Sequence, residues 1–257
     1  MSTAVANSIS LSIVSHGHAE LLRRLLQDLA ELPSLSGAKV VVTLNIPERF
    51  DAAAFPALNI ELLRNATPKG FGANHNAAFQ RCTTPWFVVL NPDLRIQEDP
   101  FPALLERAHA RRGLALLGPT ILNPAGGQED SVRDNLTPIS LLFRRALGRR
   151  RAAQVTGPAH RGKRFYWLAG MFLMLRSSAF AEVGGFDERF FMYCEDYDLC
   201  ARLYIAGHLL ELHPDVRVIH DARRDSHRSG RHLRWHLRSV ARVWTSPACW
   251  RIALSLV

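Results

Sequence analysis

Three carboxylates stand within four residues of one another, at Glu195, Asp196 and Asp198, and follow a run of mostly aromatic and apolar side chains that begins at Phe190. The apolar lead-in predicts partial burial, and crowded buried carboxylates repel one another. At least one of them must therefore be solvated, paired with a positive charge, bound to a metal, or have a raised pKa. The cluster is a candidate functional site on these grounds.

Polar side chains also follow three short apolar runs in the first third of the chain. Residues 15–18 come after the run 9–14, Asn45 comes after 40–44, and residues 91–93 come after 86–90. Functional groups in open α/β sheets gather at the carboxyl ends of strands, so these clusters are candidates as well. Each cluster alone is also explained by turn chemistry, because Ser, Asn, Asp and Gly favour turns.

An alternation of strands and helices positions these clusters. The apolar runs predict strands, with a further one at 60–63, and helical periodicity appears at 21–29 and 72–81. Such alternation is typical of a largely parallel sheet with crossover helices.

The second half of the chain predicts shorter elements. Strands are expected at 114–117, 119–122, 209–212 and 216–219, together with a strand pair within 165–175. Helices are expected at 177–183, with Ser177 or Ser178 as the N-cap and Gly184-Gly185 as the stop, and at 198–206, ended by Gly207.

Composition sets limits on the class of protein. The chain has 257 residues, 47% of them hydrophobic, which suffices for one large α/β domain or two small ones. A net charge of +9 implies a partner that carries negative charge, such as phosphate, nucleic acid or an anionic lipid surface. Four cysteines without a CxxC pair fit a reducing cytosol, and neither a signal peptide nor a membrane-spanning run of apolar residues is visible.

Two segments carry much of the positive charge. Residues 144–164 contain eight Arg and Lys among Gly and Ala, and the pattern predicts a mobile loop that is either a solvated charged face or an anion-binding element. Near the C-terminus, Leu233, Leu237, Val240 and Trp244 share one face of a predicted helix whose opposite face carries arginines. That helix suits a membrane surface, a partner groove or the protein's own core.

Together these features resemble the family 2 glycosyltransferases, whose fold is called GT-A, and within them the bacterial rhamnosyltransferase-like branch. The resemblance runs in the same order from Ile9 to His220. It rests on Ser12-Ile13-Val14-Ser15, on Lys69-Gly70-Phe71-Gly72-Ala73-Asn74-His75-Asn76, on Asn91-Pro92-Asp93, and on Trp167-Leu168-Ala169-Gly170 continuing through Gly184-Gly185-Phe186-Asp187-Glu188 to residues 195–202.

The resemblance implies an α/β fold of the GT-A type with a mostly parallel central sheet flanked by helices. A single domain is then expected over residues 1–222, with a nucleotide-binding half at 1–113 and an acceptor and catalytic half at 114–222. Residues 223–257 would form a basic amphipathic extension.

The resemblance also implies a metal site and a base. Asp93 ends the motif that binds a divalent cation, Mg²⁺ or Mn²⁺; Asn91 stands at the first acidic position of that motif, and His220 is a further candidate ligand. Asp196 corresponds to the catalytic base, with Glu195 as its neighbour in the acceptor site. Glu195 or Asp198 could be the base instead, although Asp198 is better explained as a helix-start residue.

Further residues are implied to contact the donor. Ser15 and Asn45 would lie near the base and ribose of the nucleotide, and Lys69, Gly70 and Asn76 near the diphosphate or a sugar hydroxyl. Pro68 departs from the Asn that many relatives carry there. Three histidines, His16, His18 and His75, are explained as packed or solvated side chains or as nucleotide contacts.

The expected function is inverting transfer of a sugar, rhamnose being one candidate, from a dTDP- or UDP-sugar to a glycan or lipid-linked acceptor. The protein would be cytoplasmic and peripheral at the inner face of the cytoplasmic membrane, against an anionic lipid surface. One alternative is a decayed, non-catalytic transferase-like binding module. Another is a sugar nucleotidyltransferase, which would need a Gly-rich turn after the first strand. Nucleic acid is not expected as a partner, because no stacking-aromatic motif accompanies the basic residues.

Overall fold

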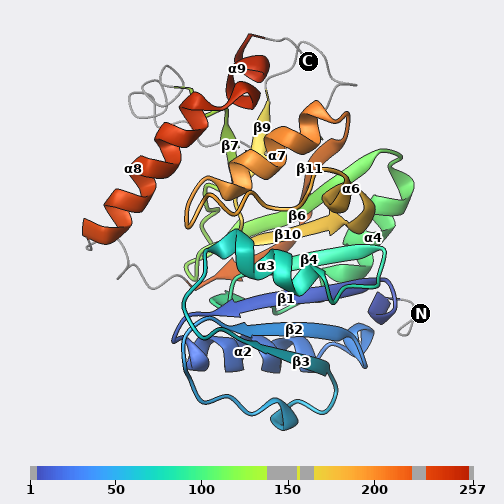
Figure 1. Ribbon diagram of the computed structural model, residues 1–257. Helices are drawn as coiled ribbons and strands as arrows, with labels where there is room; N and C mark the ends of the chain where they lie inside the picture. Colours follow the sequence, from blue (N-terminus) through green and yellow to red (C-terminus); the bar gives the residue numbers. More distant parts are fainter. Residues whose placement is uncertain (1–4, 138–154, 157–164, 222–229, 255–257) are drawn as a thin grey trace.

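The computed structural model describes residues 5–137, 155–156, 165–221 and 230–254. Its centre is a nine-stranded sheet in the order β3-β2-β1-β4-β10-β6-β11-β5, with β8 (Val155–Thr156) paired to β11 (Figure 1). The strands that form the main order are β3 (Asn59–Arg64), β2 (Lys39–Leu44), β1 (Ile9–Ser15), β4 (Trp86–Leu90), β10 (Phe172–Arg176), β6 (Leu114–Leu122), β11 (Leu209–His220) and β5 (Leu94–Arg95).

The N-terminal half confirms the predicted alternation. Strands β3, β2, β1 and β4 are parallel, with Ile13 opposite both Val42 and Leu90. Helix α2 (Ala19–Ala30) buries five leucines at the predicted spacing, and α3 (Phe71–Phe79) packs on β1 and β2. Helix α4 (Phe101–Ala110) then leads into β6. The carboxyl ends of β1, β2 and β4 therefore lie along one edge, as the sequence predicted.

Two pairs of predicted short strands are each one long strand. β6 runs through Pro119, and β11 runs through Pro214 with an irregularity between His213 and Arg217. Proline has no N–H to donate, so it disturbs the ladder of hydrogen bonds without ending the strand. The predicted breaks at these prolines were wrong for this reason.

The strands predicted within 165–175 exist but do not pair with each other. β9 (Tyr166–Leu168) pairs with β7 (Val132–Asp134) in a separate two-stranded sheet, whereas β10 runs antiparallel between β4 and β6. The link between them turns the chain from one sheet to the other, since the N–H of Ala169 donates to Ser131 and that of Met171 donates to Ala169. The predicted pair was wrong because both partners lie far away in the sequence.

Two helix starts differ from the prediction. Helix α6 (Ser177–Glu182) has Arg176 as its N-cap and no side-chain cap, because the hydroxyl of Ser177 donates instead to the carbonyl of Thr84 at 2.7 Å. Helix α7 (Glu195–Ile205) begins three residues before Asp198, so Glu195, Asp196 and Asp198 all lie in its first turn, where negative charge is favourable. Its end at Gly207, in the left-handed region with φ +98°, was predicted correctly.

The C-terminal part consists of helices α8 (Gly230–Thr245) and α9 (Pro247–Ala253), and α8 runs along one side of the molecule (Figure 1). None of the helices within the described ranges is both long and apolar enough to span a bilayer. The basic segment 144–164 lies outside the described residues except for the short strand β8 (Val155–Thr156).

Candidate active site

The carboxylate of Asp196 is held by two backbone N–H groups. Oδ2 accepts from Gly170 at 2.9 Å, and Oδ1 accepts from Tyr197 at 2.8 Å. Burial raises the pKa of Asp196, and the nearby Arg133 together with these hydrogen bonds opposes the rise. The side chain is less buried than those of its acidic neighbours. A partly exposed carboxylate with a raised pKa in a fixed orientation is suited to accept a proton.

The other two carboxylates of the first turn have different surroundings. Glu195 is buried, and its Oε2 has no hydrogen-bond partner. Burial, and then the charge of Asp196, raise the pKa of Glu195 well above its ordinary value. Asp198 forms an ion pair with Arg202 at 2.7 Å. The geometry thus favours a structural role for Asp198 and leaves Asp196 as the best placed base, while the assignment itself stays a prediction.

The backbone before the acidic pair is strained. Tyr193 and Cys194 have φ values of 72° and 65°, in the left-handed region that non-glycine residues rarely adopt. This strained segment leads directly into α7, with Cys194 as the N-cap and Glu195 and Asp196 as the first two helical residues.

Helix α8 packs against this strained segment. The Tyr193 hydroxyl lies 2.9 Å from Nδ1 of His232, Ser239 donates to the carbonyl of Met192 at 2.9 Å, and Phe191 packs on Trp235 with ring centroids 4.8 Å apart. Support of the acidic pair by the C-terminal helix was not predicted, because contacts between α8 and a segment about 40 residues earlier leave no local pattern in the sequence.

Asp93 and His220 meet at the other side of the site, as the sequence predicted. Nε2 of His220 lies 3.3 Å from Oδ2 of Asp93, and Nδ1 lies 2.8 Å from Oε2 of Glu129. The pairing of β5 with β11 brings them together, since His220 is opposite Leu94. Burial lowers the pKa of His220, but the hydrogen bonds and charges of Asp93 and Glu129 outweigh it and raise the pKa to about 8. Glu129 was not foreseen, because it lies in a polar stretch typical of loops.

This pair has the donor types that a divalent cation prefers. Oδ1 of Asp93 is buried without a hydrogen-bond partner, and an imidazole nitrogen lies beside the same carboxylate. No group of three or more His, Cys, Asp or Glu side chains suited to a metal occurs within the described ranges. The residues therefore fit a cation whose remaining ligands come from a bound diphosphate, and metal binding stays a prediction.

Asn45 is the centre of an amide network at the end of β2. Its Oδ1 accepts from the Lys69 N–H and from Asn65, both at 2.8 Å, and its Nδ2 donates to the Lys69 carbonyl at 2.9 Å and toward Nδ1 of His16 at 3.2 Å. Because these four contacts use the whole amide, the geometry favours a role in fixing the Lys69 loop. The predicted contact between Asn45 and the nucleotide base is untested.

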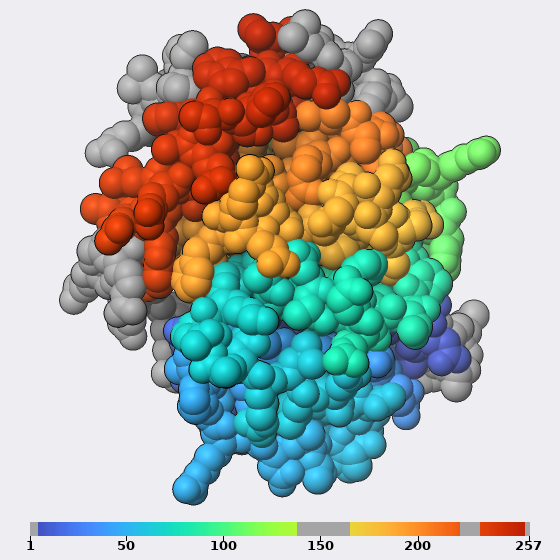
Figure 2. Space-filling view, viewed as in Figure 1, coloured from blue at the N-terminus to red at the C-terminus, as the bar shows by residue number. Residues whose placement is uncertain are grey.

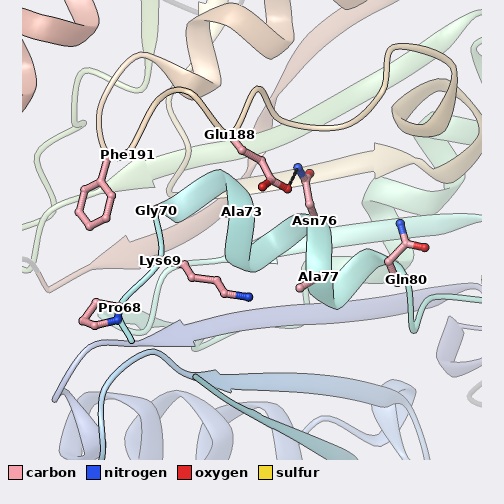
Figure 3. A pocket seen from close by; sticks show the side chains of 9 residues that line it. All are labelled: Pro68, Lys69, Gly70, Ala73, Asn76, Ala77, Gln80, Glu188 and Phe191. Atoms are coloured by element: carbon pink, nitrogen blue, oxygen red, sulfur yellow. Dashed lines mark hydrogen bonds between the residues drawn. The ribbon is translucent and has the colours of Figure 1, made fainter. Parts of the chain in front are cut away.

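Three of the predicted donor-contacting residues line a surface cavity of about 430 Å³ between α3 and the segment before α7 (Figure 3). They are Lys69, Gly70 and Asn76; the other lining residues are Pro68, Ala73, Ala77, Gln80, Glu188 and Phe191. Asn76 is tied to the far wall, because its amide bonds the backbone of Phe186 and lies 3.1 Å from a carboxylate oxygen of Glu188 (Figure 3).

The remaining predicted residues lie along the carboxyl edge of the sheet. Ser15 is buried and accepts from the His18 N–H at 3.2 Å, and the Asn91 N–H donates to the Met171 carbonyl. Their contacts with a donor stay predictions.

His75 has a structural environment. It is buried, lies 2.8 Å from the Ser12 hydroxyl and packs edge-on against Phe71. Burial lowers its pKa to about 3, so the imidazole is neutral at physiological pH. The geometry therefore favours a packed, structural role for His75 over a contact with the nucleotide.

The sequence of this chain is similar to those of known glycosyltransferases. The model of the family described as glycosyltransferase-like family 2 matches residues 8–238. An N-acetylglucosaminyl-diphospho-decaprenol L-rhamnosyltransferase of Mycobacterium tuberculosis is 31% identical over 228 residues, which cover 77% of this chain and 73% of that protein. The rhamnosyltransferase WbbL of Escherichia coli K12 is 27% identical over 248 residues, or 91% of each chain.

Solved structures share the fold. A mannosyltransferase of Pyrobaculum calidifontis, solved with GDP-Man and Mn²⁺, superposes with a TM-score of 0.63 at 15% identity over 94% of this chain and 66% of that one. GalNAc-T7, solved with UDP, GalNAc and Mn²⁺, gives a TM-score of 0.62 at 15% identity over 85% of this chain and 44% of that one. The predicted GT-A fold is thereby confirmed. The chain belongs to glycosyltransferase family 2.

Proposed function

We propose that this glycosyltransferase moves a sugar, with rhamnose as the leading candidate, from a dTDP- or UDP-sugar to a glycan or lipid-linked acceptor, with inversion at the anomeric carbon. The carrying observation is the Asp196 carboxylate, which two backbone N–H groups orient and burial makes more basic. The names of the rhamnosyltransferase relatives support the sugar and the acceptor class, and such transfer would serve the assembly of a cell-envelope polysaccharide.

The acceptor step follows from the placement of Asp196. The carboxylate takes the proton of the acceptor hydroxyl while that oxygen attacks the anomeric carbon opposite the leaving diphosphate. The Gly170 and Tyr197 N–H groups keep the carboxylate aimed during the transfer, and Arg133 limits the rise of its pKa. The raised pKa of Asp196 makes its carboxylate a better proton acceptor than an ordinary aspartate.

At the donor side, Asp93 and His220 would hold a divalent cation. Such a cation neutralises the charge that develops on the departing diphosphate. Glu129 accepts from one nitrogen of His220 and so leaves the other directed toward Asp93. Because the raised pKa keeps the imidazole protonated near neutrality, binding of the cation would release a proton.

The site of action follows from the acceptor. A lipid-linked acceptor keeps its chain in the bilayer, so we place the protein in the cytoplasm, peripheral to the inner face of the cytoplasmic membrane.

The base assignment predicts that Asp196→Asn lowers kcat by about 10²- to 10⁴-fold. Affinity for the donor nucleotide, measured by calorimetry, should stay nearly unchanged. The assay is release of nucleotide diphosphate from dTDP-rhamnose and UDP-sugars with an N-acetylglucosaminyl-diphospho-lipid acceptor. Asp198→Asn is the matched control, because the same chemical change two residues away removes only the ion pair with Arg202 and should retain most of the turnover.

Two results would contradict this proposal. Full turnover by Asp196→Asn would place the base elsewhere, and Glu195→Gln would then be tested next. Absence of nucleotide release by the unaltered protein with every donor and acceptor would instead indicate a non-catalytic binding module.

The cation site makes a separate prediction. Removal of divalent ions should weaken dTDP or UDP binding by about tenfold or more, and Mn²⁺ should restore it. Asp93→Asn should bind the nucleotide weakly with or without Mn²⁺, whereas Asp51→Asn, in an exposed loop, should behave like the unaltered protein. Metal-independent nucleotide binding by the unaltered protein would refute the cation site and leave the base assignment standing.

A further inference from the structure

The large hydrophobic side chains that are exposed within the described ranges are confined to the C-terminal helices. They are Leu233 (62% exposed), Leu237 (62%), Trp244 (37%), Trp250 (43%) and Leu254 (65%). The first three lie on α8, and the other two lie on α9 and at its C-cap. We call these five residues the apolar edge. Figure 2 shows the two helices, in red, at the outer margin of the molecule.

Helix α8 has three distinct sides. Trp235, Ser239 and Val243 face the protein, where Ser239 and Val243 are buried. Leu233 and Leu237 lie on a second side and recur one turn apart. The sequence left open whether this apolar face packs on the protein's own core. The structure packs α8 through a different stripe and leaves most of that face exposed.

Positive charge occupies the third side of α8. Arg234 and Arg238 are exposed, as is Arg251 on α9, and none of the three has a carboxylate partner among the described residues. The sequence 230–254 contains no Asp or Glu. A row of leucines beside unpaired arginines matches a surface that is apolar and negatively charged at once.

The two tryptophans are held in place along this edge. The indole N–H of Trp244 donates to the Leu136 carbonyl at 2.8 Å, and that of Trp250 donates to the Trp244 carbonyl at 2.7 Å. Both rings are therefore fixed with part of their apolar surface outward. Amphipathic rings of this kind are enriched at the interface between lipid and water.

We propose that the apolar edge and its arginines form a docking surface for an anionic phospholipid bilayer, with α8 and α9 lying in the plane of the interface. Lipid is favoured over a second copy of this chain because two copies would bring the same unpaired arginines face to face. It is favoured over a protein groove because the exposed apolar side chains are spread over two successive helices, α8 and α9, with exposed arginines on both helices.

The docking surface also explains how a lipid-linked acceptor would reach the site, an argument that rests on the proposed function. The protein-facing side of α8 contacts the segment 191–193, shortly before Glu195 and Asp196. A helix with its side chains is about 10–12 Å across, so docking through α8 holds the proposed base close to the headgroups. An acceptor attached to a lipid reaches Asp196 without leaving the bilayer.

The test measures binding of the full chain to vesicles, without donor or acceptor, by co-sedimentation. Vesicles of phosphatidylcholine with phosphatidylglycerol should bind it, and vesicles of phosphatidylcholine alone should bind it much more weakly. Leu233→Ser with Leu237→Ser should weaken binding by about tenfold or more, because two exposed apolar side chains lose their burial. Both side chains are exposed, so thermal melting should be unchanged.

A charge-matched pair of variants isolates the arginines. Arg234→Gln with Arg238→Gln should weaken binding by roughly fivefold for each arginine and reduce its dependence on salt. Arg49→Gln with Arg112→Gln removes the same charge from exposed positions elsewhere and should change binding little.

Several outcomes would overturn the docking surface. One is equal loss of binding in both arginine pairs, which would show a diffuse effect of net charge. Another is undiminished binding after both leucine substitutions. A third is a dimer in light scattering that the leucine substitutions convert to a monomer while vesicle binding persists, which would assign the edge to self-association. Vesicle binding and light scattering do not depend on turnover. A negative result for the docking surface is therefore distinguishable from a negative result for the proposed function.

Discussion

At the scale of single residues, the buried carboxylate of Glu195 destabilises the folded protein when it is ionised. Its side chain is buried with Oε2 unpartnered, and burial and the charge of Asp196 raise its pKa well above the ordinary range. A carboxyl group whose pKa is higher in the folded state stabilises the fold below the ordinary pKa. This contribution is lost as the pH rises through the raised value.

Glu195→Gln should therefore stabilise the protein at alkaline pH. The amide does not ionise, so the melting temperature at pH about 8 should rise by roughly 2–4 °C for each kcal/mol gained. The gain should shrink toward pH about 4, where both residues are neutral. Melting curves over this pH range provide the measurement, with Glu98→Gln on the exposed surface as a control that should show no such trend. A lower melting temperature at alkaline pH would mean that the ionised carboxylate is stabilised by its surroundings.

At the scale of secondary-structure elements, the N-terminus of α3 touches the segment before α7 backbone to backbone. A Cβ on Gly70 would lie 2.7 Å from the Phe191 carbonyl oxygen and 2.9 Å from its Cα. The Phe71 N–H donates to that same oxygen at 2.9 Å. Glycine is therefore required by the close approach of two elements and not by its own φ of −66°.

Gly70→Ala should destabilise the protein by about 1–3 kcal/mol, because backbone atoms must move apart. Gly170→Ala is the matched control: its Cβ would meet atoms at 3.4 Å or more, which is ordinary contact, and the N–H that binds Asp196 is retained. Urea unfolding of both variants measures the difference. Equal destabilisation of the two would show that the Gly70 contact is not the cause.

The elements themselves were predicted well where their signal is local. Runs such as 86–90 and the leucines of α2 encode their own structure through periodicity. Prediction failed for the pairing of β9 and β10 and for the cap of α6. In these cases the strand or side chain pairs with a segment that is distant in the sequence and not with its neighbour. The Ser177 hydroxyl, for example, donates to the Thr84 carbonyl.

At the scale of the whole molecule, the two halves predicted from the resemblance share one sheet. β10, from the second half, lies between β4 and β6, with Met174 opposite both Val88 and Leu117. The halves 1–113 and 114–222 are therefore expected to unfold together, although their sequences suggest different tasks.

Calorimetry of the full chain should accordingly show a single main transition for the sheet, with a ratio of calorimetric to van't Hoff enthalpy of about 1. Far-UV circular dichroism and tryptophan fluorescence should report the same midpoint. Two separate transitions would contradict a shared core.

The sequence by itself determined the family, the order of strands and helices in the first half, and the short list of acidic and polar residues from which a site could be built. Only the tertiary structure showed that Glu195 is buried without a partner for Oε2 while the Asp196 carboxylate is held by backbone N–H groups. It also showed that α8 packs on the segment before both residues. Adjacent residues in a helix point about 100° apart, so which carboxylate is buried depends on how α7 is rotated against its neighbours. That rotation, like the choice of the stripe through which α8 docks, is set by packing between distant segments, which no local pattern of residues records.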